Sequence, residues 1–182
     1  PGTMRYVPVD STLWLASAPL REFWDAARPH AAAFFADGGA STPLRELAAD
    51  LRKQLAERAI RLDGPDDLPA LGIDPSGSAA WAWRARAPAG TVLVVPVLDR
   101  TRFLDAVRRW YGAEPQPTED AAPAALQAGS DFIGFGADGS AVVADNRELL
   151  REVLAQQQAQ LDHHRSVDRD MRSFRTLRPA PE

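Results

Sequence analysis

Residues 79–110 read AAWAWRARAPAGTVLVVPVLDRTRFLDAVRRW, and this stretch decides the fold. Two runs rich in aromatic and β-branched residues, 79–86 and 91–98, flank Pro88-Ala89-Gly90, which predicts a β-hairpin. Asp99 then precedes apolar residues at helical spacing, so we expect this aspartate to cap a helix that packs back on the hairpin. The stretch therefore predicts a β-β-α unit.

A second unit of the same kind follows further along the chain. Strands at 131–136 and 141–144 flank Asp138-Gly139, which favours a type I′ turn because both central residues of that turn need a positive φ. Asp145 and Glu148 have the spacing of a capping box and predict a helix that continues to about residue 161. The segment 79–161 thus holds two predicted β-β-α units.

The two strand–helix junctions share the pattern V-x-D-x-x-x-[FL]-L-x-x-V, with Val97 and Val143 separated by 46 residues (143 minus 97). A duplication would explain the match, and so would the ordinary recurrence of strand, Asp cap and helix. Asp99 and Asp145 are predicted to be equivalent caps. The expected fold is α+β, an antiparallel sheet with helices mainly on one face, and the element order resembles a ferredoxin-like core.

The first part of the chain, 1–61, is predicted to hold one strand and two helical segments. The strand covers 12–16, and a helix follows that is expected to kink or break near Arg28 because Pro29 is inside its pattern. Thr42 is a predicted N-cap, followed by Pro43 and leucines at helical spacing. We expect a mobile loop at 113–130 and a C-terminal helix and tail at 162–182.

Composition limits the classes of function. The 182 residues fit a single domain, 1–182, with 45% hydrophobic and 25% charged residues. A net charge of −4 argues against nucleic acid as a partner, and the lack of cysteine removes disulfides and thiol catalysis. The apolar runs are too short for a membrane span, and no cofactor is expected.

Scattered segments resemble the first half of a group of exported bacterial proteins of unknown function. The segments are Tyr6-Val7-Pro8-Val9-Asp10-Ser11-Thr12, the turn Leu71–Gly77, Val94–Val97 before Asp99, and Ser166–Pro179. Members of this group open with Y-V-P-A-D-T and carry an L-G-L-D-P-x-G turn; this chain departs from the opening at Val9 and Ser11. The resemblance implies a periplasmic or envelope location, a signal segment or lipid anchor upstream, and a longer natural protein. It implies no catalytic residues.

Catalytic and metal-binding patterns are weak. His163 and His164 are adjacent and so point to different sides of a helix, and His30 has no partner at helical spacing. Gly134–Gly139 matches G-x-G-x-x-G by letter, but a hairpin and no helix follows the glycines. We therefore predict no catalytic residue and no metal site. A hydrolase that uses His163 or His164 with a carboxylate remains the least favoured alternative.

Two binding functions remain open. Trp81 and Trp83 are predicted to face the helices, together with one of the two alternating sets of the next strand, Val92 and Val94 or Leu93, Val95 and Val97. The opposite, open sheet face would contact a protein partner, a further copy or the continuation of the chain, and its candidate residues are Arg84, Arg86, Val92 and Val94. This reading predicts a non-catalytic envelope domain that acts through protein contact. The alternative is a binding module for an apolar or amphiphilic ligand, which aromatic side chains of the first helix would line. These side chains are Phe23, Trp24, Phe34 and Phe35.

Overall fold

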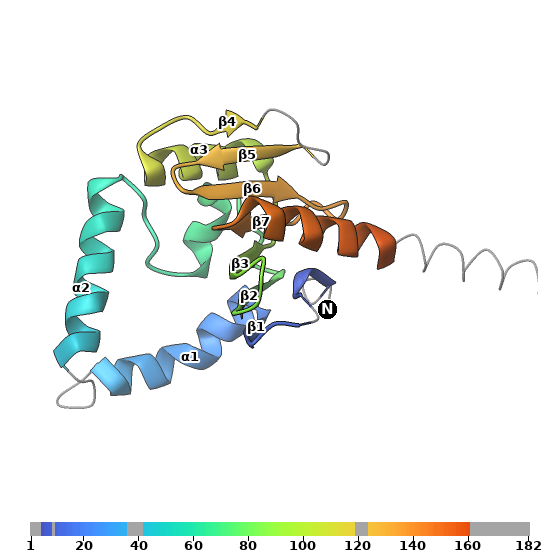
Figure 1. The fold of residues 1–182 in the computed structure, drawn as a ribbon. Coiled ribbons are helices and arrows are strands. Elements are labelled where there is room, and N and C mark those ends of the chain that lie inside the picture. Colours follow the sequence, from blue (N-terminus) through green and yellow to red (C-terminus); the bar gives the residue numbers. More distant parts are fainter. Residues whose placement is uncertain (1–4, 9, 36–41, 119–123, 161–182) are drawn as a thin grey trace, which may run out of the picture.

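A seven-stranded antiparallel sheet forms the centre of the computed structural model, which describes residues 5–8, 10–35, 42–118 and 124–160 (Figure 1). Its strands are β1 (Leu13–Pro19), β2 (Ser78–Arg84), β3 (Gly90–Val95), β4 (Gln116–Pro117), β5 (Ala125–Ala128), β6 (Asp131–Phe135) and β7 (Ala141–Ala144). Their order across the sheet is β1-β2-β3-β7-β6-β5-β4. Two meanders, β1–β3 and β4–β7, thus meet at the ladder between β3 and β7. The predicted α+β class with an antiparallel sheet is confirmed.

The connectivity differs from two expectations. β1 and β2 are direct antiparallel neighbours at one side of the sheet. No strand separates them, so the split arrangement of a ferredoxin-like core is not formed. The segment 113–130, expected to be a loop, contributes β4 and β5, which pair through Gln116 with Gln127 and Pro117 with Leu126. The described residues beyond β7 form a helix over 147–160, and the expected C-terminal helix at 162–182 lies outside the described residues.

Both predicted hairpins are present. β2 and β3 pair from Ala80–Val94 to Arg84–Gly90. The β6–β7 turn differs from the predicted type I′, because Gly139 has a φ of +84° and Asp138 does not have a positive φ. The Gly139 N–H donates to the Gly136 carbonyl, and the Gly136 N–H donates to the Ser140 carbonyl. The hairpin loop is therefore longer than a two-residue type I′ turn, and Gly139 is the residue in it with a left-handed conformation.

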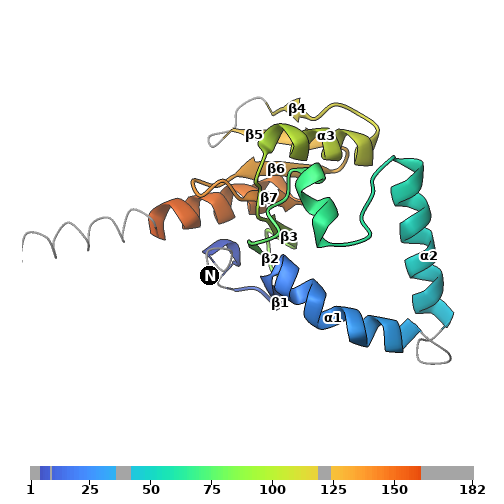
Figure 2. The same cartoon turned by 180° about the vertical axis from the view of Figure 1, so that it is seen from behind.

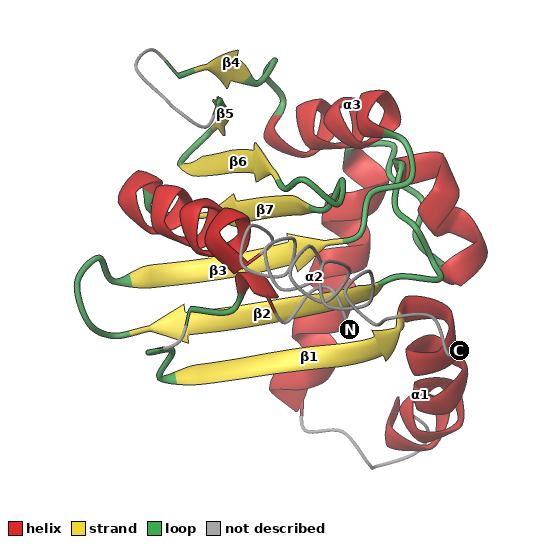
Figure 3. Ribbon diagram, turned by 90° about the vertical axis from the view of Figure 1, so that its right-hand side faces the viewer, coloured by secondary structure: helices red, strands yellow, loops and turns green. Residues whose placement is uncertain are grey.

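Helices cover both faces of the sheet, rather than mainly one. In Figure 3 the 147–160 helix passes in front of the strands, whereas α2 (Thr42–Glu57) lies behind them. The helix 147–160 packs on one face in a core made of Tyr6, Val7, Ala80, Ala82, Val92, Val94, Ala125, Val142, Ala144, Leu149, Leu150, Val153 and Leu154. On the opposite face α3 (Arg100–Tyr111) packs in a second core made of Phe103, Val107, Ala128, Ile133 and Ala141.

The two helix caps are not at equivalent positions, because the second lies one residue later than the sequence pattern predicts. Asp99 caps α3 as predicted, since its carboxylate accepts the N–H groups of Thr101 and Arg102. The prediction for Asp145 is wrong. Asn146 caps the 147–160 helix by accepting from the N–H groups of its first turn. The carboxylate of Asp145 instead accepts from the N–H and the hydroxyl of Thr91 on β3.

A simple duplication does not explain the two β-β-α units. β3 and β7 are antiparallel neighbours, so a two-fold axis that exchanged them would stand perpendicular to the sheet. Such an axis keeps each face on its own side and would place both following helices on the same face. α3 and the 147–160 helix lie on opposite faces, so the shared sequence pattern reflects similar local junctions.

The segment between β1 and β2 extends away from the sheet. α1 (Leu20–Phe35) leaves the end of β1, and α2 returns toward α3, as the two opposite views show (Figures 1 and 2). The Leu20 N–H donates to the Gly77 carbonyl, which ties the start of α1 to the turn before β2. Pro29 is inside α1, which continues past Arg28, so the helix does not break there. The short 3-10 helix η2 (Pro65–Leu71) connects α2 to β2.

Candidate binding surface

Arg84, which the sequence placed on an open face, is buried in the core with 2% of its surface exposed. Val92 and Val94 are buried beside it under the 147–160 helix, and Arg86 alone of the four predicted face residues is exposed. The predicted open face is therefore wrong. The physical reason is that Arg84 forms an ion pair with Glu152, which is 68 residues away in sequence and neutralises its charge. Ala80 and Ala82 on the same face are small enough for the helix to approach.

The guanidinium of Arg84 is held by four hydrogen bonds. Its Nη1 and Nη2 donate to the two carboxylate oxygens of Glu152 at 2.6 and 2.9 Å. Nη1 also donates to Asp10 at 3.1 Å, and Nε donates to the Pro88 carbonyl at 2.9 Å. The bond from Arg84 lowers the pKa of Glu152, and the bond to Glu152 raises the pKa of Arg84. This cluster joins the N-terminal segment, the β2–β3 loop and the 147–160 helix.

The N-terminal segment has a second anchor in Tyr6. Its ring is fully buried, and its hydroxyl donates to the Asp138 carboxylate in the β6–β7 turn. Burial, reinforced by the contact with Asp138, raises the pKa of Tyr6. Gly136 leaves room for the hydroxyl, because a Cβ there would lie 1.8 Å from the Tyr6 oxygen. Tyr6 and Asp10, which begin and end the Y-V-P-V-D opening, therefore act as structural anchors.

The opposite face of β1–β3 carries an apolar strip, defined by Leu13, Leu15, Phe23, Trp81, Trp83 and Leu93. The strand registers place Leu13 beside Trp83, and Leu15 beside Trp81, which in turn is beside Leu93. Cross-strand neighbours of this kind form rows on one face of a sheet. Phe23 reaches the strip from α1, where it lines a pocket of about 310 Å³ together with Leu15, Trp81 and Leu93. Trp81 and Trp83 were predicted to be core residues, but this face is only partly covered.

Large exposed hydrophobic side chains concentrate around β1. Leu13, Trp14 and Leu15 are 51%, 49% and 62% exposed, and Phe23, Trp83 and Leu93 are 52%, 41% and 41% exposed. Among the described residues, only Leu98, at 62%, is a large exposed hydrophobic residue outside this region. Trp14 alternates with Leu13 and Leu15 and therefore points to the other face of the sheet. β1 is an edge strand that exposes apolar side chains on both faces.

The edge of β1 has little protection against pairing. Edge strands usually carry charges, prolines or bulges that prevent contact with other strands. The sequence of β1, LWLASAP, contains no charged residue. Its only irregularities, a register shift after Ala16 and the terminal Pro19, lie at one end. The edge over Leu13–Ala16 is therefore open to a further strand.

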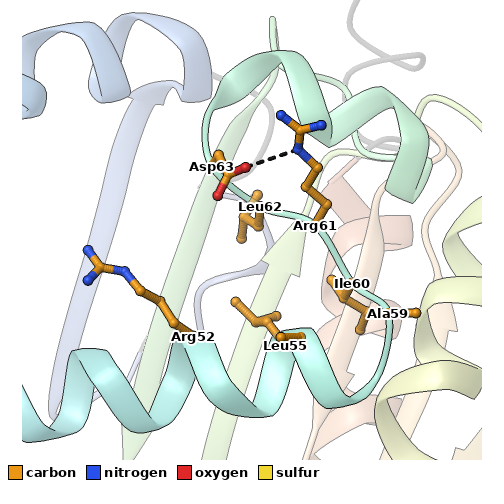
Figure 4. Close-up of a pocket in the computed structure, with 8 residues that line it drawn as sticks. Arg52, Leu55, Ala59, Ile60, Arg61, Leu62 and Asp63 are labelled. Carbon is orange, nitrogen blue, oxygen red and sulfur yellow. Dashed lines mark hydrogen bonds and ion pairs between the residues drawn. The ribbon is translucent and has the colours of Figure 1, made fainter.

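A second feature is a hollow between α2, the connection that follows it, α3 and the sheet. Its outer part, about 430 Å³, is lined by Arg52, Leu55, Ala56, Ala59, Ile60, Arg61, Leu62 and Asp63. Figure 4 shows Leu55 and Leu62 facing each other across this part, and the ion pair between Arg61 and Asp63. Its inner part, about 370 Å³, has an almost wholly apolar lining that includes Leu93, Val95, Phe103 and Trp110. The two parts share Leu55, Ile60 and Leu62.

The other predicted site residues are placed as follows. Phe23 is in the apolar strip, and Trp24 is half-buried in α1. The side chains of Phe34, Phe35, His30 and Thr42 lie outside the described residues, as do His163 and His164. Sequence reasoning missed the hollow, because its walls come from α2, α3 and the sheet, and nothing local indicates that they enclose a space.

In the part of the chain that the structure describes, no group of three or more histidine, aspartate or glutamate side chains could hold a metal ion. None of the described helices is long and apolar enough to span a membrane. No family model, curated protein or solved structure matches the chain. The resemblance to exported bacterial proteins therefore stays a prediction.

Proposed function

We propose that this chain is a non-catalytic domain of the bacterial envelope that acts through protein contact at the β1 edge. The observation that carries the proposal is the exposure of Leu13, Trp14 and Leu15, about half or more each, on both faces of an unprotected edge strand. The envelope location rests on the sequence resemblance alone.

The occupant that best fits this edge is β1 of a second copy. Pairing across a two-fold axis would continue the antiparallel ladder, and two-fold dimers are the commonest oligomers. Such pairing sets residue i of one β1 opposite residue j of the other and j opposite i, so a charged residue near the axis would lie close to its own copy. β1 has none.

The exposed area is of the right order for such an interface. Side chains of this size that are half exposed each leave roughly 100 Å² open to solvent. The six around β1 thus present roughly 600 Å² of apolar surface, whereas a standard interface buries about 800 Å² on each partner. The backbone of the edge strand would supply most of the remaining area.

Light scattering over a concentration range tests the proposal. The wild-type chain is expected to form a dimer, and the double variant Leu13→Lys, Leu15→Lys is expected to stay a monomer because lysines on an edge strand oppose pairing. Leu98→Lys is the matched control, since Leu98 is as exposed as Leu15 but lies away from the edge. It should leave the dimer intact.

A wild-type chain that stays monomeric at high concentration would overturn the proposed occupant. Equal loss of dimer in the double variant and in the Leu98→Lys control would also overturn it, because the contact would not then depend on β1. Circular dichroism of each variant separates a lost contact from a lost fold.

A further inference from the structure

The hollow beside α2 changes in polarity along its length. Its inner part is lined by apolar side chains apart from Tyr111, whose hydroxyl is already bonded to Asp131. Its outer part is bordered by Arg52, Arg61 and Asp63. The two parts are adjacent, because the apolar residues Leu55, Ile60 and Leu62 line both of them. A ligand that fits both parts would have a polar end and an apolar end.

Arg52 supplies the charge at the mouth. It precedes Leu55 by three residues, so the two side chains share one face of α2, and Figure 4 shows both leaving the helix on the same side. Arg61 is engaged by Asp63 at 2.9 Å and Asp67 at 3.5 Å. Within the described part of the chain, no carboxylate lies within ion-pair distance of Arg52. Its guanidinium is available to a carboxylate from outside, which it can bind through two parallel hydrogen bonds.

We propose that the hollow binds a single-chain amphiphile with an anionic headgroup, of the long-chain carboxylate class. The headgroup lies at Arg52, and the acyl chain passes Leu55 and Leu62 to reach Val95 and Trp110. The apolar part alone, at about 370 Å³, is at the lower end of the range for small-molecule pockets, so it has room for one acyl chain rather than two. The hollow and the apolar strip share Leu93, but Arg52, Val95 and Trp110, which would hold the headgroup and the acyl chain, lie outside the strip.

Calorimetric titration of the full chain with octanoate, decanoate and dodecanoate, each below its micelle concentration, tests the acyl site. Affinity is expected to rise by up to about fourfold for each added methylene that becomes buried. Arg52→Glu should weaken dodecanoate binding roughly tenfold and leave dodecanol binding unchanged. Lys53→Glu is the matched control, with the same change of charge on the next residue of α2, which does not line the hollow.

Ala106→Leu tests the position of the acyl chain. Ala106 lines the inner part from α3, and leucine suits a helix while it fills the space. This variant should lose dodecanoate binding and keep the wild-type melting temperature. If it fails to fold, the comparison of Arg52→Glu with Lys53→Glu still decides, because both positions are exposed.

Three results would overturn the inference. They are no saturable binding of any of the carboxylates, an affinity that does not change with chain length, or equal weakening by Arg52→Glu and Lys53→Glu. Flotation with phosphatidylglycerol vesicles distinguishes a free amphiphile from a membrane surface. Association with vesicles without saturable dodecanoate binding would also overturn it.

Discussion

Removing Glu152 and removing Arg84 should lower the free energy of unfolding by different amounts. Glu152→Ala leaves the guanidinium of Arg84 in the core, where 2% of it is exposed, with Asp10 and the Pro88 carbonyl as remaining partners. Removing one partner of a buried ion pair costs about 3–5 kcal/mol. Because the Glu152 side chain is 48% exposed, solvent already weakens the pair, and we expect a loss of roughly 2–3 kcal/mol.

Arg84→Met should cost less, roughly 1 kcal/mol. Methionine keeps most of the apolar stem in the core, and the two carboxylates left behind are each about half exposed and can be hydrated. Urea unfolding of both single variants and the double variant measures these free energies. The double variant should resemble Arg84→Met, since no buried charge is left without a partner. A larger loss for Arg84→Met than for Glu152→Ala would refute this reasoning.

The same contact has a defined pH dependence. Hydrogen bonding to Arg84 lowers the folded-state pKa of Glu152 below its ordinary value of 4.5, which it regains in the unfolded chain. Its contribution to stability is therefore complete above about pH 4.5 and is lost as the pH falls through the lower folded-state value. The free energies of unfolding of wild type and Glu152→Gln should converge as the pH falls below 4.5. A constant difference down to pH 2 would contradict the assignment.

Two further predictions concern local geometry. Asp99→Ala and Asn146→Ala should each lower the free energy of unfolding by about 1 kcal/mol in urea titrations, because each removes a helix cap; no change at either position would contradict the capping role. Gly136→Ala should cost about 1–3 kcal/mol and alter the near-ultraviolet dichroism of Tyr6, because the added Cβ meets its hydroxyl. Gly64→Ala is the control, since a Cβ there meets nothing within 4 Å, and equal effects at both glycines would refute the steric argument.

The two hairpins and the first cap could be predicted from sequence because their signals are local. The hairpin at residues 79–98 and the cap at Asp99 depend on neighbours within a few positions. Asp145 shows where local reasoning stops. It has the spacing of a cap, but Thr91 offers it two hydrogen bonds from across the sheet, and Asn146 takes its place.

The candidate surface could not be predicted because the charge of Arg84 was taken to mean that its face of the sheet is exposed to solvent. Arg84 alternates with Trp81 and Trp83 on β2, and the usual expectation places the arginine outside and the tryptophans inside. The structure reverses this order, since Glu152 and Asp10 neutralise Arg84 within the core. Both partners are distant in sequence. The tryptophans are left on the face that α1 and α2 cover only in part.

The junction of the two meanders determines how the sheet can come apart. β3 and β7 meet over four residue pairs, from Val92–Ala144 to Val95–Ala141, and they bring together segments about 50 residues apart in the chain. The other ladders join strands of one meander, and among them β1 and β2 pair residues that are even further apart, such as Leu13 and Trp83. Closing a loop of either length costs more conformational entropy than closing a hairpin, so this junction is expected to form after the β2–β3 and β6–β7 hairpins. The 147–160 helix lies across this junction and packs on side chains from both meanders, so it holds the two parts of the sheet together. Amide exchange would then be governed by the docking of that helix as much as by the hydrogen bonds of the sheet.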